Sequence, residues 1–233
     1  MKTIHRSLSW LVLLLVPFAL TFVGLRLLLT RAFPEVEYRL PGFPADTYGF
    51  TLQDRLKWSE ISIDYLVNGA DISYLGNQVF SDGSPLYNPR ELSHMQDVKN
   101  VIQPVLWIGY VVWFLLIGLA AWSRFGVWGS EFALGLRRGG WVTVGLVAVL
   151  GLLAAVSFWQ FFTVFHELFF KGDSWLFLYS DTLIRLFPLP FWESAFLFAG
   201  LLDVACGLAL GLGLRKSNRS RSGAQLRGFE TER

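Results

Sequence analysis

Four long apolar stretches constrain this 233-residue chain more than any other feature. A helix needs about 20 mostly apolar residues to cross the hydrocarbon core of a bilayer. The stretches that meet this length lie at residues 8–29, 101–122, 141–165 and 191–214. Charged residues make up only 16% of the chain, against about 25% in soluble domains. The mean hydropathy is +0.45. The sequence therefore predicts an all-α integral membrane protein with four transmembrane helices.

The first apolar stretch could be read as a secretory signal peptide, because Lys2 and Arg6 give it a basic start. Its apolar run exceeds 20 residues, whereas the core of a signal peptide has about 7–15. The segment that follows, "LLLTRAFPE", is a poor cleavage site because it lacks a small-x-small pattern. We therefore expect the first stretch to remain as a membrane span.

The basic residues predict how the chain is oriented, because cytoplasmic segments of membrane proteins are enriched in Lys and Arg. The N-terminus, the connection at 123–140 and the tail at 215–233 are all basic, and four spans place all three on one side. Residues 31–100 carry ten acidic and six basic side chains and fall on the other side. We therefore expect a multi-pass membrane protein with both termini in the cytoplasm. Residues 31–100 would form an extracytoplasmic cap between the first two spans.

The spans and the cap would together form one domain over residues 1–214. The basic tail at 215–233 is expected to be disordered and to contact anionic lipids. No nucleic-acid partner is expected, because no binding fold accompanies this short tail. The single cysteine, Cys206, cannot form an internal disulfide and is expected to pack as a small apolar residue. The "GLALG" segment at Gly207–Gly211 permits close helix packing, within or between chains, and the oligomeric state stays open.

Local signals also predict the structure of the cap. Prolines and glycines before residue 51 indicate extended chain and turns. Thr51 and Asp54 resemble a capping box at the start of an amphipathic helix. Turn residues between 69 and 88 allow a short hairpin. Asn88, followed by proline and Glu91, then predicts the start of a helix that enters the membrane near Val101.

Two of the three histidines converge on one face of the membrane in this topology. His94 lies about seven residues, or roughly 10 Å of helix, before the second span begins. His166 lies at the outer end of the third span. His5 is on the opposite, cytoplasmic side. An ionisable side chain next to an apolar run such as "FFTVFHELFF" suggests a functional site.

Several kinds of site could use this pair of histidines. Both could simply be interfacial anchors. A metal site could use His94, Asp97, His166 and Glu167, but "HELFF" lacks the second histidine of H-E-x-x-H, so no metal is predicted. A serine hydrolase is disfavoured because the chain contains no G-x-S-x-G. The histidines could also act as general acid and general base in a transfer whose nucleophile belongs to the substrate.

The segments "RELSHMQDVK" and "FHELFFKGDSWLFLYSDTLIRLFP", with "YGFT…DRLKWSEISIDYL" in the cap, resemble the bacterial lipoprotein intramolecular transacylase family of four-span membrane proteins. The resemblance extends to about Leu214. It implies an O-to-N acyltransferase that needs no cofactor. Such an enzyme moves an acyl chain from the glyceryl sn-2 oxygen to the N-terminal cysteine amine of the same lipoprotein, giving a lyso-form lipoprotein. His94 and His166 would be catalytic, and the partners would be diacylglyceryl lipoproteins and membrane lipids.

Further candidates lie beside these histidines or in the outer loop. They are expected to support the site or bind substrate: Asp97, Arg90, Phe165, Phe170, Asp173, Trp175, Tyr179, Asp181 and Arg185. The aromatic residues could form walls for acyl chains or anchor the chain at the interface. Asp97 could orient His94, and the charged loop residues could order the loop or bind the head region of the substrate. A non-catalytic membrane protein that binds lipoproteins or lipids at the outer leaflet is the alternative function.

Overall fold

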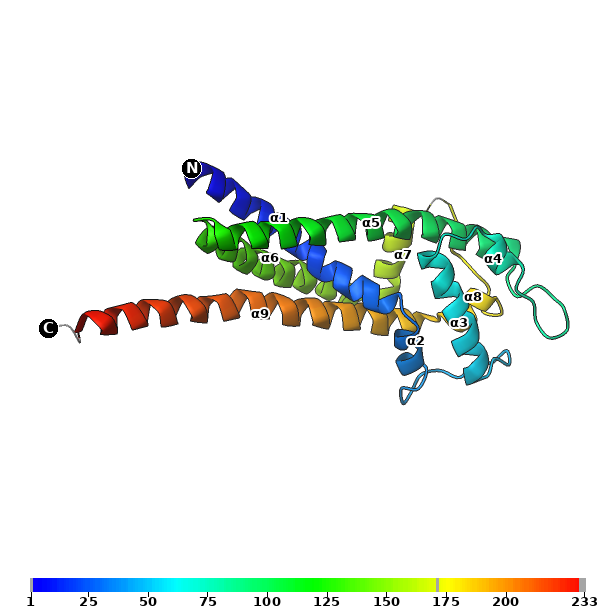
Figure 1. Cartoon of the computed structure of the whole chain (residues 1–233). Coiled ribbons are helices and arrows are strands. Elements are labelled where there is room, and N and C mark those ends of the chain that lie inside the picture. Colours follow the sequence, from blue (N-terminus) through cyan, green and yellow to red (C-terminus); the bar gives the residue numbers. More distant parts are fainter. Residues whose placement is uncertain (1, 171, 231–233) are drawn as a thin grey trace. The chain divides into compact units, whose positions relative to one another are not determined.

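Nine helices form in the part of the chain that the structure describes (Figure 1). The computed structural model describes the backbone of residues 2–170 and 172–230 and the side chains of residues 3–170 and 172–213. The helices are α1 (Lys2–Leu28), α2 (Ala32–Glu37), α3 (Leu52–Val67), α4 (Ser73–Gly76), α5 (Pro89–Phe125), α6 (Gly129–Val156), α7 (Phe158–Phe169), α8 (Thr182–Leu186) and α9 (Leu189–Glu230). An isolated bridge between Val79 and Pro85 closes the short hairpin expected in the cap.

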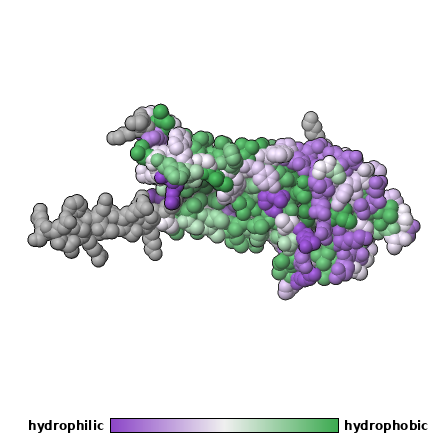
Figure 2. Space-filling model, in the orientation of Figure 1, coloured by the Kyte–Doolittle hydropathy of each residue, from purple (hydrophilic) through white to green (hydrophobic). Residues whose placement is uncertain are grey.

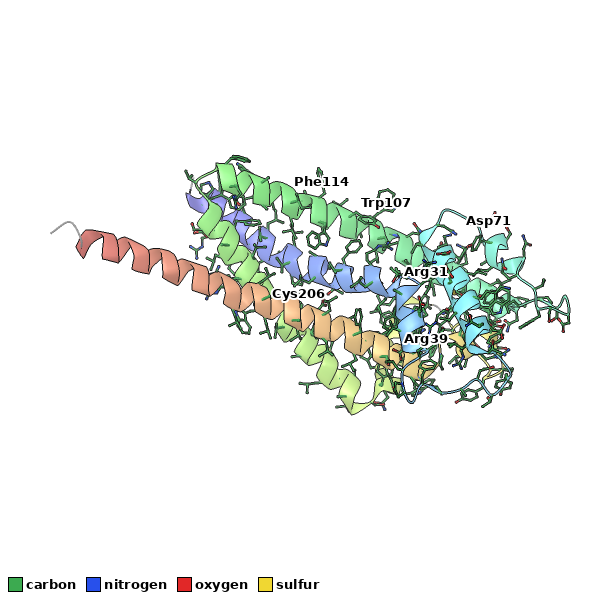
Figure 3. The ribbon with its side chains drawn as sticks, turned by 60° about the horizontal axis from the view of Figure 1, so that its bottom comes forward. Arg31, Arg39, Asp71, Trp107, Phe114 and Cys206 are labelled. Carbon is green, nitrogen blue, oxygen red and sulfur yellow. The ribbon has the colours of Figure 1, made fainter. Side chains whose placement is uncertain are left out.

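Four of these helices are long and apolar enough to cross a membrane. The candidate spans are Thr3–Leu28, Pro89–Phe125, Gly129–Val156 and Leu189–Gly213. They confirm the predicted fold class, an all-α membrane protein with four spans. Trp107 and Phe114 project from α5 (Figure 3), as side chains that face lipid would. Hydrophobic side chains cover the flanks of the long helices, whereas hydrophilic ones gather over α2, α3, α4 and α8 (Figure 2).

Two compact units make up the chain, and the first consists of helices alone. It holds α1 up to Val23, Gly109–Gly151 of α5 and α6, and α9 from Gly200 onward. A Cβ added to Gly140 would lie 2.6 Å from the backbone oxygen of Gly207, so the two backbones meet directly. The close packing expected of "GLALG" is therefore confirmed within the chain.

Polar side chains in the first unit also join its helices. Thr21 Oγ1 donates a hydrogen bond to Asp203 Oδ2 over 2.7 Å and so links α1 to α9. Asp203, an acidic residue within the fourth span, therefore faces another helix. Cys206, one turn further along α9, is half-buried (Figure 3), which agrees with a packing role.

The second unit holds Gly24–Ile108 and Leu152–Ala199 and contains both candidate histidines. Its hydrophobic core joins α3, α4, α8 and the start of α5. The buried members of this core are Trp58, Tyr65, Leu75, Leu86, Tyr87, Met95, Leu183 and Leu186. Tyr38 follows α2 and donates a hydrogen bond to the Leu186 carbonyl over 2.8 Å. These contacts fix α8 against the cap helices.

The start of the cap contains one predicted element and one that was missed. Thr51 Oγ1 accepts the Asp54 N–H, and the Asp54 carboxylate accepts the Thr51 N–H, which completes the predicted capping box of α3. Residues 32–37 were expected to be extended but form α2. Pro34 lies in the first turn of α2, where its fixed φ and missing N–H are tolerated.

The third apolar stretch forms two helices, although we predicted a single span over 141–165. Helix α6 ends at Val156, and Ser157 adopts an extended backbone before α7 begins at Phe158. Ser157 Oγ accepts the N–H of Gln160 over 3.3 Å and so caps α7. The unbroken apolar run concealed this cap. His166 therefore lies on a separate short helix and not at the end of a long span.

The basic tail differs in part from expectation. The structure continues α9 to Glu230, whereas we expected disorder from residue 215. The side chains of 214–233 lie outside the described residues. The contact of the tail with anionic lipids therefore stays a prediction.

Candidate functional site

Helix α5 begins with a reciprocal cap that fixes the turn before His94. Asn88 Oδ1 accepts the N–H of Glu91 over 3.0 Å, and the Glu91 carboxylate accepts the N–H of Asn88 over 2.8 Å. The second carboxylate oxygen accepts the N–H of Leu183, in α8, over 2.6 Å. Glu91 is only 1% exposed. The predicted helix start is confirmed, and the same glutamate also attaches α8 to α5 beside His94.

Helix α7 carries His166 in its last turn. Nδ1 of His166 lies 2.8 Å from the carbonyl oxygen of Phe162. A carbonyl can only accept a hydrogen bond, so Nδ1 carries the hydrogen and Nε2 keeps its lone pair in the neutral ring. Beyond α7 the chain turns at Gly172, whose φ of +69° favours glycine. The returning segment then places Trp175 against His166, with 4.8 Å between the ring centroids.

The rings of His94 and His166 stack against each other in a closed aromatic site. Their centroids lie 6.1 Å apart, the planes differ by 22°, and each residue is 8% exposed. Phe170 contacts both rings, with centroid distances of 5.0 Å to His94 and 5.6 Å to His166. Phe177 lies 5.3 Å from the ring of His94. The structure therefore brings the two histidines together as the predicted topology required.

The environment of His166 keeps its ring neutral. Burial lowers the pKa of His166 below its ordinary value, because the charged form loses solvation. The hydrogen bond to the Phe162 carbonyl acts in the opposite direction but is the smaller effect. A neutral ring at neutral pH has a free Nε2 lone pair and can accept a proton.

Asp97 does not orient His94, which corrects one prediction. Nδ1 of His94 is buried and has no hydrogen-bond partner among the described residues. Asp97 lies three residues further along α5, half-buried and without a hydrogen bond to His94. Residues three apart on a helix are neighbours, but rotamer and packing decide whether they meet. Within the described residues there is also no group of three or more His, Cys, Asp or Glu side chains that could hold a metal ion.

The aromatic candidates differ in how closely they lie to the two histidines. Phe170 and Trp175 are buried against the histidines. Phe165 is more exposed, and its ring lies 5.7 Å from that of His166. Tyr179 is exposed, and it lines a separate pocket. Not all of the aromatic residues predicted for the site therefore lie against the histidines.

Three polar candidates have distinct positions in the outer loop. Arg90 Nη1 donates to the carbonyl of Leu176 over 3.1 Å and so fastens the segment that carries Trp175. The Asp181 carboxylate accepts the N–H of Leu178 over 2.8 Å, just before α8. Asp173 is exposed at the surface of the loop. The structure gives Arg90 and Asp181 a loop-ordering role, whereas it shows no contact of Asp173 with either histidine.

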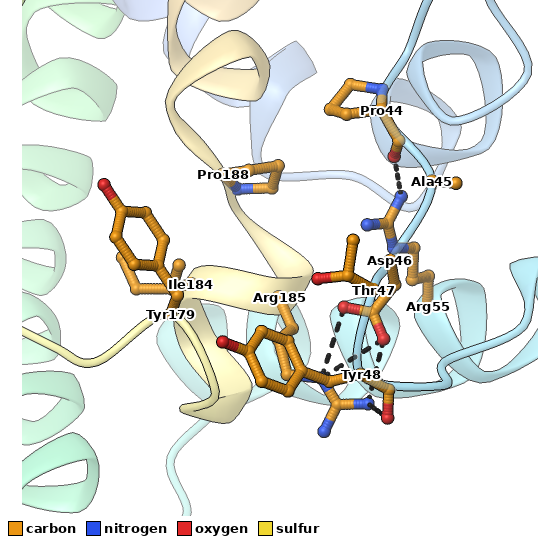
Figure 4. Close-up of a pocket in the computed structure, with 10 residues that line it drawn as sticks. All are labelled: Pro44, Ala45, Asp46, Thr47, Tyr48, Arg55, Tyr179, Ile184, Arg185 and Pro188. Carbon is orange, nitrogen blue, oxygen red and sulfur yellow. Dashed lines mark hydrogen bonds and ion pairs between the residues drawn. The ribbon is translucent and has the colours of Figure 1, made fainter.

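Arg185 lines a pocket of about 290 Å³ in the cap-containing unit, apart from the two histidines (Figure 4). Its guanidinium pairs with Asp46 at 3.0 Å, and these side chains are 10% and 3% exposed. Burial alone would raise the pKa of Asp46, but hydrogen bonds from Arg185 and from the N–H of Phe50 lower it overall. Arg185 also lies flat over the ring of Phe50, 3.4 Å from its centroid. Its observed role is therefore to hold the cap together.

Sequence reasoning missed parts of the site that depend on long-range contacts. Glu91 was expected only to start a helix, and nothing local indicated its bond to Leu183. The cap at Ser157, which decides where α7 begins, had a signal in the glutamine three residues later. No local pattern around Asp46 predicted its ion pair with Arg185, which lies 139 positions further along the chain.

Known proteins resemble this chain over most of its length. The model of the family described as lipoprotein intramolecular transacylase Lit matches residues 8–192. An uncharacterized protein of Aquifex aeolicus (strain VF5) is 25% identical over 207 residues, which cover 88% of this chain and 91% of that protein.

Solved structures with a similar fold come from the same family. The membrane integral lipoprotein intramolecular transacylase Lit from Bacillus cereus superposes with a TM-score of 0.75 and 19% identity, over 94% of this chain and 100% of that one. A variant of that enzyme with a histidine replaced by arginine superposes with a TM-score of 0.66 and 18% identity, over 96% and 97% of the two chains. At these identities the structures show a shared fold.

Proposed function

Since the chain belongs to the lipoprotein intramolecular transacylase family, we propose that His94 and His166 are the acid–base pair of an O-to-N acyl transfer within one lipoprotein molecule. Membership of this family makes the chain a membrane-integral transacylase of lipoproteins. The observation that carries the finer proposal is the stacked pair itself. The ring centroids of the two histidines lie 6.1 Å apart, and both side chains are almost fully buried among aromatic rings. Residues that only anchor a protein at the membrane surface would be exposed to water.

The proposed substrate is a diacylglyceryl lipoprotein whose N-terminal cysteine has a free amine. The amine nitrogen attacks the carbonyl carbon of the sn-2 ester, and the carbonyl π electrons move to its oxygen. When the carbonyl re-forms, the bond between the acyl carbon and the glycerol oxygen breaks. One proton leaves the nitrogen and one reaches the glycerol oxygen, so the equation balances without a cofactor. The product is an N-acylated lipoprotein with one acyl chain left on the glycerol.

His166 is the proposed general base. Its Nδ1–H is held by the Phe162 carbonyl, so Nε2 is the nitrogen left to accept the amine proton. The lowered pKa keeps Nε2 unprotonated at neutral pH. His94 is the proposed general acid: it donates a ring N–H to the departing glycerol oxygen while its other ring nitrogen takes up the proton that His166 accepted from the amine. Both rings are neutral again when this relay is complete.

The aromatic walls would contribute mainly by orienting the substrate. Counting through the cysteine, the sulfur and the glycerol, the transition state is an eight-membered ring, so the reacting groups are tethered but flexible. Well-oriented intramolecular reactions can lower the barrier by roughly 7–11 kcal/mol. Phe170 contacts both histidine rings, and Phe177 borders His94, so both could restrict the substrate close to the reacting atoms.

We place the reaction at the extracytoplasmic face of the bacterial cytoplasmic membrane. Support comes from the basic N-terminus, 123–140 connection and tail, which favour a cytoplasmic location. The histidines belong to the unit that contains the acidic segment 31–100, which would then lie outside. The lipid anchor of a lipoprotein lies in the outer leaflet on that side, next to the proposed site.

The test is to express the chain in a bacterium that lacks this activity and to determine the N-terminal structure of its lipoproteins. Because the transfer is intramolecular, substrate and product have the same mass, so fragmentation must locate an acyl group on the nitrogen. His94→Ala and His166→Ala should each abolish the N-acyl form. His5→Ala is the matched control, because His5 lies in the other unit. Absence of N-acyl product from well-expressed wild-type protein would refute the proposal.

The alternative is that this member only binds lipoproteins or lipids. The variant His166→Asn separates the two functions, because asparagine keeps a polar, hydrogen-bonding side chain but cannot act as a base at neutral pH. If the protein only binds lipoproteins, this variant would still associate with them, and neither the variant nor the wild-type protein would give an N-acyl product. The enzyme would lose product while the substrate continued to bind.

A further inference from the structure

Unpaired polar atoms occur in the histidine site and in the segments that carry it. Among the described residues, buried side-chain atoms without a hydrogen-bond partner include His94 Nδ1, Thr163 Oγ1, Ser174 Oγ and Trp175 Nε1. Thr163 precedes His166 by one turn of α7, and Ser174 and Trp175 lie in the segment that returns over it. Buried polar groups in native proteins almost always have a partner. Two of these atoms, His94 Nδ1 and Trp175 Nε1, belong to rings that pack in the histidine site, where a bound molecule can supply the missing partners.

Trp175 is the most constrained of these unpaired groups. The indole N–H is a donor only, whereas the hydroxyls of Thr163 and Ser174 can rotate toward other acceptors. The ring is 8% exposed and packs on His166 at 4.8 Å and 35° between planes. The direction of its N–H is therefore set by packing, and the N–H lacks an acceptor before substrate binds. A fixed, dry donor beside an acid–base pair is the arrangement that stabilises a developing negative charge.

We propose that the indole N–H of Trp175 donates a hydrogen bond to the acyl carbonyl oxygen as it becomes an oxyanion. This inference rests on the proposed acyl transfer. When the amine nitrogen bonds to the acyl carbon, the carbonyl π electrons move to oxygen, and that oxygen gains the strongest acceptor character in the reaction. Trp175 transfers no proton. Its hydrogen bond strengthens as the charge forms and weakens when the bond to the glycerol oxygen breaks and the carbonyl re-forms.

The position of Trp175 also explains why a tryptophan suits this place. A charged donor, such as lysine, would raise the cost of protonating a nearby histidine through like-charge repulsion. The neutral indole N–H stabilises the oxyanion without this effect. Its large apolar face covers His166 at the same time and excludes water from the neutral ring. Arg90 donates a hydrogen bond to the carbonyl of Leu176, the residue after Trp175, and so holds this segment in place from outside the site.

The decisive experiment replaces the indole N–H by an isosteric group without a donor. Trp175→Phe removes the N–H but also part of the ring, so the second variant carries β-(3-benzothienyl)alanine, in which sulfur replaces N–H. We expect kcat to fall about 100- to 1,000-fold in both variants, as when an oxyanion donor is removed. KM should change little, because the hydrogen bond is strongest in the transition state.

The matched control is the same pair of replacements at Trp128. Trp128 is also buried with an unpaired indole N–H, but it belongs to the other unit. These control proteins should retain wild-type kcat. If the benzothienyl variant at Trp175 keeps wild-type kcat, the indole N–H is not the donor, and Trp175 only packs or binds water. An inactive wild-type protein would instead overturn the proposed transacylation and this inference together.

Discussion

The buried carboxylate of Glu91 gives the sharpest stability prediction, because it satisfies backbone groups of two separate segments. It accepts the N–H of Asn88 at the start of α5 and the N–H of Leu183 in α8. Replacing Glu91 by alanine removes both acceptors and leaves the chain otherwise intact. Each buried N–H that loses its acceptor costs about 1–3 kcal/mol. Both losses together would cost about 2–6 kcal/mol.

The environment of each N–H narrows this range. Leu183 is buried, so water cannot replace the carboxylate there. Asn88 is half-buried, so water can partly compensate at the helix start. We therefore expect Glu91→Ala to lower the free energy of unfolding by about 2–4 kcal/mol. Glu91→Gln keeps one acceptor oxygen and should lose only about 1–3 kcal/mol.

The measurement is denaturant unfolding of the purified protein in detergent micelles. Glu60→Ala is the control, because Glu60 is 45% exposed and only pairs with the exposed Arg31 at 3.5 Å. An exposed ion pair contributes about 0–1 kcal/mol, so this variant should be close to wild type. The reasoning would be refuted if Glu91→Ala were no less stable than Glu60→Ala. It would also be refuted if glutamine at position 91 destabilised the protein more than alanine does.

Two further predictions concern other contacts. Gly140→Leu should destabilise the protein by about 1–3 kcal/mol in the same unfolding assay, because the new Cβ would lie 2.6 Å from the backbone oxygen of Gly207. Gly145→Leu is the control and should not destabilise the protein, because the space around its Cβ is open. The pKa of Asp46 is lower in the folded state than its ordinary value of 3.8. The ion pair of Asp46 with Arg185 therefore stabilises the protein fully above pH 3.8. This stabilisation is lost as the pH falls through the pKa that Asp46 has in the folded state. Unfolding measured from pH 6 to pH 2 should therefore show a smaller loss of stability in Asp46→Asn than in wild type, and equal slopes would contradict the assignment.

Local signals predicted most of the helices correctly. The capping residues of α3 and α5 form the predicted bonds, because a cap involves only groups within a few residues of each other. The break at Ser157 was missed, although Ser157 and Gln160 have the spacing of a helix cap, because the apolar residues on both sides kept the mean hydropathy high. Helix α2 was missed because proline is compatible with a first helical turn as well as with loops.

The candidate site was predictable only in outline. Topology alone placed His94 and His166 on the same side of the membrane. It could not show that Asp97 stays apart from His94, or that the Trp175 ring packs on His166. Such contacts depend on rotamers and on how segments that are distant in the chain pack, and neither follows from residue spacing.

The sequence by itself determined the class of the protein. Four apolar stretches of sufficient length require spanning helices, since a bilayer core leaves no other partner for backbone groups. Charge distribution and the two histidine segments then indicated orientation and family. Tertiary structure alone decided the geometry of the site: the stacking of His94 on His166 and the packing of a buried, unpaired indole beside them. The two histidines lie 72 positions apart, so their contact depends on how separate helices pack. Hydropathy, helix caps and the hydrogen bond of His166 Nδ1 to the Phe162 carbonyl involve only neighbouring residues.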